Sequence, residues 1–300
     1  MTSPEASRIA AELRTWPAPD GVSVDEWRQR AGTPDDPGAT GVVTWPVADA
    51  VGGSSWASVG RSTGNAGAAP DGPIMVWFHG GGFVVCSVDT HRVTAAHAAA
   101  AIGGTALVAD YRLAPEAPFP AAIDDGVAMM RWLRTRGVDP ARTVIAGDSA
   151  GGNLAITITL ALRDAGDPLP AAVVAVSSWT DLTLSAPSLL THRAIDPFAH
   201  LDDLPRMREL YLGDVDPRDP LASPLFADLA GLPPLLAVVG DTETLLDDSS
   251  RLVEAALASG VTAELVVIEG AFHTWLNYVG RLPEADTALA AIGEFVRPLL

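Results

Sequence analysis

The chain has 300 residues, of which 48% are hydrophobic, and a formal net charge of -18, so it can bury a large core and its acidity disfavours nucleic-acid and anionic-membrane partners. All 19 basic residues are arginines, which excludes Schiff-base, pyridoxal and P-loop chemistry because each needs a lysine amine. The single cysteine, Cys86, offers neither an internal disulfide nor a metal cluster and favours a reduced, cytoplasmic setting.

The N-terminal segment, residues 1–40, combines an amphipathic helix with several prolines. Its start lacks the basic and apolar regions of a signal peptide, and no apolar run approaches the length of a membrane span. A second segment, about residues 185–215, separates two later strands where a short connection would suffice. We expect these two segments to form a helical cap on one α/β domain that covers residues 1–300.

Between these segments, short apolar runs alternate with longer amphipathic stretches. Residues 40–46 and 55–60 predict a hairpin, and the small-residue stretch 61–72 predicts an exposed loop. The predicted buried strands are 74–78, 105–109, 143–146, 171–176, 235–239 and 264–268. The predicted helices are 90–101, 121–136, 153–164, 246–259 and 284–299. This alternation predicts a mostly parallel, doubly wound α/β sheet with right-handed crossovers.

The pattern G-x-S-x-G occurs twice, around Ser62 and around Ser149. The copy at Ser149 follows a predicted strand and opens a predicted helix, which is the setting of a nucleophile elbow, whereas Ser62 has neither neighbour. We therefore predict Ser149 as the nucleophile on a strained turn. Gly147 and Gly151 are required because larger side chains would collide across that turn. A glycine-rich helix start that binds phosphate is the alternative.

A glycine run, residues 79–82 with the sequence H-G-G-G, follows the strand 74–78 and can offer backbone N–H donors to a tetrahedral intermediate. Gly81 and Gly82 are the predicted donors. The N–H of Ala150 is a third, because the positive end of a helix dipole lies there. His79 is expected to order this loop and not to exchange protons.

Six histidines are candidates for the general base. His273 is the one that follows the last predicted strand, where the order serine, acid, histidine requires the base. His91 and His97 are expected on a helix surface. His192 and His200 fall in the predicted cap.

The acid that orients the base is expected in the loop 240–248, which carries four carboxylates. Asp247 and Asp248 are predicted in the first turn of the next helix, where the helix dipole explains acidic residues without catalysis. Asp241 and Glu243 both remain candidates from the residues alone.

Together these motifs resemble the hormone-sensitive-lipase-like family of α/β-hydrolases, in its bacterial branch with a G-D-S-A-G elbow. The resemblance runs from about Val42 to the C-terminus and includes Y-R-L-A-P-E at 111–116 and D-P-L-A-S-P at 219–224. Cys86 is a departure, because similar sequences usually carry glycine there. A buried structural thiol is expected at that position.

The resemblance implies an α/β-hydrolase fold and carries the family's roles onto matching residues. The family's D-P-L-x-D-E-like motif falls on residues 243–248 and so places Glu243 where aspartate is commoner. The implied triad is Ser149, Glu243 and His273, and the implied oxyanion donors are Gly81, Gly82 and Ala150.

These residues predict hydrolysis of a small-molecule carboxylic ester through an acyl-enzyme, with no metal or cofactor required. Phe83, Trp179 and Trp275 suggest a substrate pocket for short acyl groups, although core packing explains these aromatics equally well. Neither nucleic acid nor membrane is an expected partner, and a homodimer is allowed. Amide or N-acetyl hydrolysis is an alternative. Noncatalytic small-molecule binding is another, and the retained His273 argues against it.

Overall fold

A computed structural model describes residues 2–14, 22–31, 42–45, 55–59, 72–197 and 203–300. The strands form one sheet in the order β1-β2-β4-β3-β5-β6-β7-β8. They are β1 Val42–Trp45, β2 Ser55–Val59, β3 Ile74–Phe78, β4 Thr105–Asp110, β5 Thr143–Asp148, β6 Ala172–Val176, β7 Leu235–Gly240 and β8 Ala263–Ile268. Each pair of neighbours from β4 to β8 is parallel, which confirms the predicted α/β sheet.

The antiparallel part of the sheet is the predicted hairpin. Val42 of β1 pairs with Val59 of β2, and β2 continues antiparallel to β4. The predicted exposed loop lies outside the described residues except for its last residue, Gly72.

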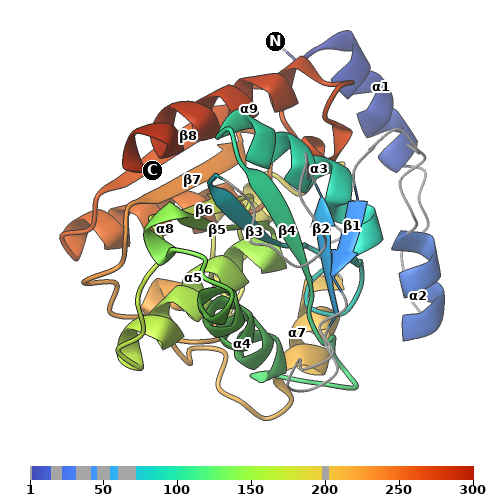
Figure 1. Ribbon diagram of the computed structural model, residues 1–300. Coiled ribbons are helices and arrows are strands. Elements are labelled where there is room, and N and C mark those ends of the chain that lie inside the picture. The colour runs from blue at the N-terminus through green and yellow to red at the C-terminus, as the bar shows by residue number, and fades with distance from the viewer. Residues whose placement is uncertain (1, 15–21, 32–41, 46–54, 60–71, 198–202) are drawn as a thin grey trace.

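Helices cover both faces of the sheet (Figure 1). They are α1 Pro4–Leu13, α2 Val24–Ala31, α3 Val88–Ala101, α4 Ala121–Thr135, α5 Ala150–Asp164, α6 Ser188–Thr191, α7 Asp203–Leu212, α8 Leu246–Ala258 and α9 Pro283–Val296. The buried side chains of α1, α3 and α9 belong to one hydrophobic cluster, and those of α4, α5 and α8 belong to the other. Among the described helices, none is long and apolar enough to cross a membrane.

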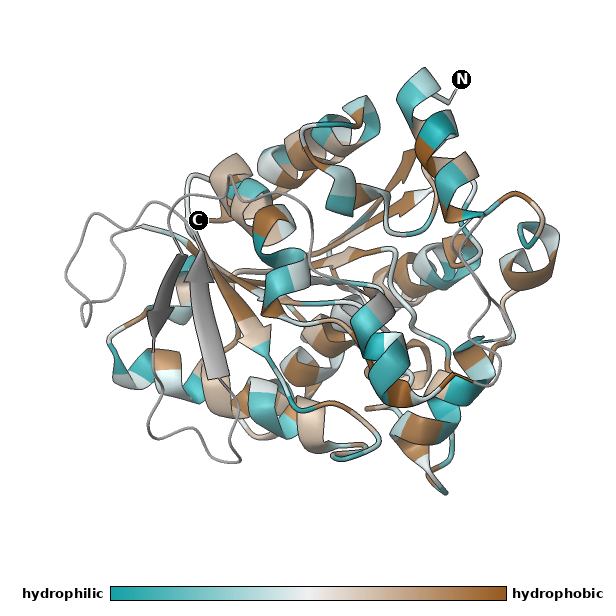
Figure 2. Cartoon of the chain, turned by 90° about the vertical axis from the view of Figure 1, so that its right-hand side faces the viewer, coloured by the Kyte–Doolittle hydropathy of each residue, from teal (hydrophilic) through white to brown (hydrophobic). Residues whose placement is uncertain are grey.

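The two hydrophobic clusters exist because side chains alternate across a strand. Along β3, Met75 and Trp77 point into the cluster under α3 and α9, whereas Val76 and Phe78 point into the cluster under α4 and α5. Figure 2 accordingly shows hydrophobic strands in the centre and helices with a hydrophilic outer face. Burying one such apolar side chain stabilises the folded state by about 1.5–3 kcal/mol relative to leaving it exposed to water.

The described parts of the two predicted cap segments contact the α/β body and each other. Ser3, directly before α1, donates hydrogen bonds from its N–H and its hydroxyl to Glu284 of α9, both at 3.0 Å. On α2, Arg28 donates to the carbonyl of Val84 at 2.9 Å. Arg206 of α7 donates to the carbonyl of Val22, just before α2, at 2.7 Å. These contacts connect α2 to both the body and α7.

Candidate active site

Ser149 lies on the sharp turn between β5 and α5, with φ of 53° and ψ of -119°. Its N–H donates to the carbonyl of Val176 at 2.9 Å, which ties the turn to the end of β6. A Cβ atom on Gly151 would lie 1.9 Å from the carbonyl oxygen of Phe78, and one on Gly147 would lie 2.4 Å from the backbone of Gly151. The predicted strained turn and its need for glycine are therefore confirmed.

His273 lies in the loop after β8, which β6 and β7 separate from β5 in the sheet, and its side chain reaches the turn at Ser149. Its Nε2 atom lies 3.2 Å from Ser149 Oγ, and its Nδ1 atom lies 3.0 Å from Glu243 Oε2. Burial alone would lower the pKa of His273, but the hydrogen bond and charge of Glu243, together with the charges of Asp196 and Asp148, outweigh burial and raise the pKa. Glu243 thus orients the imidazole, whose other nitrogen contacts the Ser149 hydroxyl.

Glu243 follows β7 and its side chain is fully buried. Besides His273, it accepts hydrogen bonds on Oε1 from the Gly240 N–H at 2.7 Å, the Ser177 hydroxyl at 2.6 Å and the Trp275 indole at 2.9 Å. A carboxylate accepts hydrogen bonds on both oxygens, so these donors suit its ionised form. Trp275, predicted as a pocket residue, is fully buried and supports this carboxylate.

The other carboxylates of the same loop bind elsewhere. Asp241 accepts a hydrogen bond from the Gly270 N–H at 2.7 Å and so ties the loop after β7 to the loop after β8. Asp247 and Asp248 lie in the first turn of α8, as predicted. Of the two candidates that the residues alone left open, the structure therefore brings Glu243 to the imidazole.

The glycine-rich loop after β3 lies beside the turn at Ser149, because Phe78 is in register with Gly147 across β3 and β5. Gly81 and Gly82 have φ of 102° and 59°, a region that favours glycine. A Cβ atom on Gly81 would lie 2.3 Å from the carbonyl oxygen of Val85. At Gly82 the sulfur of Met207, from α7, would lie 2.0 Å from an added Cβ atom, so both positions are too crowded for a larger residue.

His79 is fully buried within that loop. Its Nδ1 atom lies 2.7 Å from the Gly80 carbonyl oxygen, and its ring stacks on Tyr111 with centroids 4.3 Å apart. Burial, followed by the neighbouring His91, lowers the pKa of His79 to about 3. A neutral ring held in this way is suited to ordering the loop.

His91 is not on the surface, and the prediction that placed it there is wrong. Its side chain is buried, and Nε2 lies 3.1 Å from Asp148 Oδ2 directly before the nucleophile turn. Asp148 also accepts a hydrogen bond from the Trp77 indole at 3.1 Å. The alanines of α3 give little contrast between its faces, so the sequence did not indicate which face packs on the sheet. His97 is exposed, as predicted.

The sequence places His192 and His200 in the predicted cap. His192 ends α6, where its Nδ1 atom lies 2.9 Å from the Thr191 hydroxyl. His200 lies outside the described residues.

Cys86 has φ of 70°, which explains why glycine is the usual residue at this position in similar sequences. The Cys86 side chain is partly and not fully buried, and desolvation raises the pKa of its thiol to about 12, so the thiol is protonated at neutral pH. No group of three His, Cys, Asp or Glu residues is arranged to hold a metal ion within the part of the chain that the structure describes.

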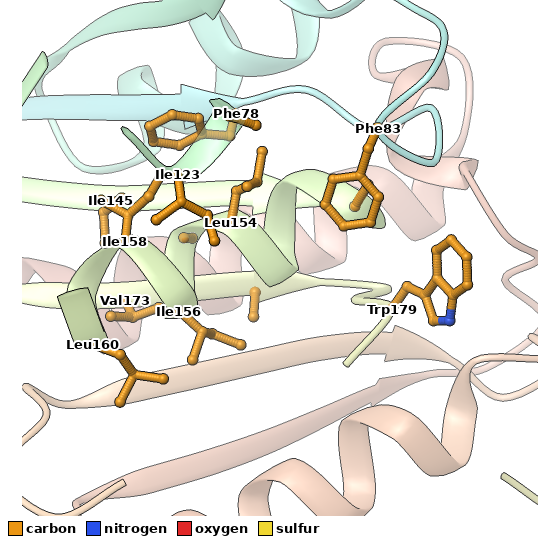
Figure 3. Close-up of a cluster of buried hydrophobic side chains, with 14 of the residues drawn as sticks. Phe78, Phe83, Ile123, Ile145, Leu154, Ile156, Ile158, Leu160, Val173 and Trp179 are labelled. Atoms are coloured by element: carbon orange, nitrogen blue, oxygen red, sulfur yellow. The ribbon is translucent and has the colours of Figure 1, made fainter. Parts of the chain in front are cut away.

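The aromatic residues near the glycine-rich loop are tightly packed. Phe83 is fully buried and stacks on Tyr211 of α7 with ring centroids 3.8 Å apart. The ring centroids of Phe83 and Trp179 are 6.1 Å apart. Figure 3 shows Phe83 and Trp179 together at one end of the core cluster. These rings connect α7 with the body beside Ser149.

Comparison with known proteins agrees with this arrangement. A family model described as the α/β hydrolase fold matches residues 75–277. An "Acetyl-hydrolase" from Streptomyces hygroscopicus is 44% identical over 230 residues, which is 77% of each chain. A crystal structure described as an esterase from the bacterial hormone-sensitive lipase family is 40% identical, covers 100% of this chain and 99% of its own, and has a TM-score of 0.86. A protein named EstE5, in a crystal soaked with p-nitrophenyl butyrate, is 37% identical with a TM-score of 0.88, and 99% of each chain is covered.

Proposed function

This chain belongs to the α/β-hydrolase fold family, among the bacterial hormone-sensitive-lipase-like esterases, and on that premise we propose that Ser149, His273 and Glu243 form its catalytic triad. Its relatives are named esterases and carboxylesterases, and the chain is a serine ester hydrolase of this kind. The observation that carries the proposal is the continuous contact from the Ser149 hydroxyl through the imidazole to a buried carboxylate, at 3.2 and 3.0 Å. A nucleophile, a base and an orienting acid need this order.

In the proposed reaction, Nε2 of His273 takes the Ser149 proton as Oγ attacks the carbonyl carbon of the ester. The resulting imidazolium is stabilised by Glu243, and it then gives the proton to the leaving alcohol as the acyl-enzyme forms. A water molecule, deprotonated by the same imidazole, attacks the acyl-enzyme and releases the carboxylic acid. Ser149 regains its proton, and no co-reactant beyond ester and water is consumed.

The negative oxygen of each tetrahedral intermediate is proposed to accept hydrogen bonds from the N–H groups of Gly81, Gly82 and Ala150. Ala150 begins α5, where the first N–H groups have no intrahelical acceptor and the helix dipole is positive. Donors that are fixed before the reaction need no reorganisation during it. Removing one such donor costs about 2.7–4 kcal/mol of transition-state stabilisation in related chemistry.

The proposed substrates are esters with short acyl groups. Phe83, Tyr211 and Trp179 are almost completely buried and pack on one another, and the Trp179 N–H donates to the Ser149 carbonyl at 3.2 Å. In this proposal, long acyl chains would have to displace these packed rings. The similarity to a protein named as an acetyl-hydrolase supports the same size class. Phe83 is the residue that we assign to the acyl side of the pocket.

Two other activities are compatible with the fold. Amide or N-acetyl hydrolysis would use the same three residues and differs in the leaving group alone. Noncatalytic binding would need no base, and the 3.2 Å contact between His273 and Ser149 argues against it.

The test is hydrolysis of p-nitrophenyl esters from acetyl to long acyl chains, with matched anilides in parallel. The Ser149→Ala variant at equal folded concentration is the control. We expect turnover that depends on Ser149 and is highest for acetyl to butyryl esters. Faster turnover of anilides would instead favour the amidase activity. Equal turnover by Ser149→Ala, or none on any substrate, would overturn the proposal.

A further inference from the structure

A second buried carboxylate, that of Asp196, contacts the backbone of the proposed base and of the residue that follows the proposed acid. Asp196 lies between α6 and α7 and is 4% exposed. Its Oδ1 atom accepts a hydrogen bond from the His273 N–H at 3.2 Å. Its Oδ2 atom accepts from the Thr244 N–H at 2.9 Å and from the Thr244 hydroxyl at 3.2 Å. One side chain thus bridges the base residue and the residue directly after Glu243.

The two loops that Asp196 joins extend from adjacent strands. β7 and β8 are in register up to the pair Gly240 and Ile268, where both strands end. Just beyond the strands, the Thr242 hydroxyl donates to the Ala271 carbonyl at 2.6 Å. Asp196 makes the connection farther along both loops, next to the reacting side chains. Next to the acid and the base, the two loops are therefore also joined by a residue that belongs to neither loop.

The segment that carries Asp196 is held in place by contacts on its N-terminal side. Arg14, at the end of α1, donates to the carbonyls of Ala194 and Ile195 at 3.2 and 2.9 Å. The Ser188 hydroxyl on α6 donates to the Thr244 carbonyl at 2.6 Å. These contacts limit the movement of the Asp196 backbone, so its carboxylate can act as a fixed bridge.

The chemistry of the bridge requires a carboxylate. N–H or O–H donors face both oxygens of Asp196, and an amide in its place would turn a donor toward a donor. The negative charge also favours the protonated form of His273, together with Glu243 and Asp148. Asp196 therefore has both the geometry to position the base and the charge to stabilise its cation.

We propose that Asp196 is a positioning residue for ester hydrolysis, which holds the acid loop and the base loop in register from the segment between α6 and α7. This inference rests on the proposed triad, since it assigns Asp196 a role through His273 and Glu243. Asp196 touches no reacting atom.

The test compares the wild type with Asp196→Asn, which keeps the side-chain shape but removes the charge and one acceptor. We expect kcat to fall about tenfold or more with KM nearly unchanged, because the lost hydrogen bond to a charged group acts on the base and not on substrate binding. The acid limb of kcat/KM should move to lower pH, since His273 loses a stabilising charge. Asp247→Asn is the matched control, because Asp247 also accepts a hydrogen bond from a backbone N–H, that of Ser188 at 2.8 Å. This variant should leave kcat and the acid limb of kcat/KM unchanged.

A second measurement needs no turnover. Histidine-labelled protein is titrated by NMR, with His273→Gln to assign the signal. The His273 pKa should fall by about half a unit or more in Asp196→Asn and stay constant in Asp247→Asn. Because this readout is independent of activity, it separates failure of the inference from failure of the proposed triad.

Thr244→Val, which deletes one donor to the bridge, replaces Asp196→Asn if that variant does not fold. Its kcat should fall by a smaller factor. An unchanged His273 pKa in Asp196→Asn, or unchanged kcat in either bridge variant, would overturn the proposal.

Discussion

Glu243 Oε2 lies 3.0 Å from His273 Nδ1, while Oε1 of the same carboxylate accepts hydrogen bonds from three other groups. The side chain is fully buried, so its negative charge is directed at the imidazole with little solvent screening. Asp241, two residues earlier, faces the Gly270 N–H instead. This difference makes the two acids experimentally separable.

Replacing Glu243 by Gln should reduce kcat by about 10³- to 10⁴-fold, because the amide no longer favours the correct tautomer or the cation of the base. Asp241→Asn should change kcat by less than about tenfold, since it alters a contact between two loops. Steady-state kinetics on p-nitrophenyl acetate, with thermal unfolding as a control for folding, measures both. A larger loss in Asp241→Asn than in Glu243→Gln would contradict our assignment of the acid.

The pH dependence of the free enzyme should report the raised pKa of His273. The imidazole must be neutral to accept the serine proton, so kcat/KM falls as the pH drops through that pKa. Glu243 raises the pKa despite burial, and the midpoint of the acid limb is therefore expected above 6.5. A midpoint below 6.5 in a kcat/KM profile would show that the base is less stabilised than the structure indicates.

Much of this site was predictable from the chain. The turn at Ser149 and the position of His273 follow from local patterns, because the strand and helix that flank each of them have clear hydrophobic periods. The choice between Asp241 and Glu243 did not follow from such patterns. Both residues lie in one short loop, and the choice depends on which carboxylate turns toward a histidine 30 residues later.

The features that the sequence did not predict, the role of Asp196 and the burial of His91, depend on contacts between distant segments. Asp196 lies in a stretch predicted as cap, and its partner His273 is 77 residues away. His91 was misplaced because its alanine-rich helix lacks a distinct apolar face, so the buried contact with Asp148 left no periodic signal. In both cases a polar residue is buried because it has a specific partner, which hydrophobic patterns do not reveal.

The nucleophile turn should not tolerate a methyl group at Gly151. Its Cβ would lie 1.9 Å from the Phe78 carbonyl oxygen, within the backbone of the central sheet. We expect Gly151→Ala to lower the free energy of unfolding by about 3 kcal/mol or more in urea titrations. Gly137→Ala, at φ of 82° with nothing within 4 Å of the added atom, should cost about 1–2 kcal/mol from backbone strain alone. Equal losses would contradict the crowding at the turn.

Asp248 should make the protein less stable as the pH rises. Burial and then the charge of Asp181 raise its pKa to about 8, and its Oδ1 atom has no hydrogen-bond partner among the described residues. Between about pH 4 and pH 8 the folded state therefore holds a proton that the unfolded state has released. The free energy of unfolding falls as the pH rises through this range.

Urea unfolding at pH 6 and pH 8 measures this effect. Asp248→Asn cannot ionise, so between these pH values it should lose about 1–2 kcal/mol less stability than the wild type, within the limit set by one proton. Asp247→Asn is the control on the same turn and should follow the wild type. Identical pH dependence of wild type and Asp248→Asn would show that the buried carboxyl does not titrate in this range.

The most direct test of the triad is covalent labelling with phenylmethylsulfonyl fluoride, followed by intact-mass analysis and peptide mapping. A serine activated by its histidine should take one sulfonyl group, and esterase activity should be lost in proportion to labelling. We predict a single adduct on Ser149 in the wild type, none in Ser149→Ala and strongly slowed labelling in His273→Gln. An adduct on another residue that accompanies inactivation, or full activity in a protein labelled at Ser149, would contradict the account.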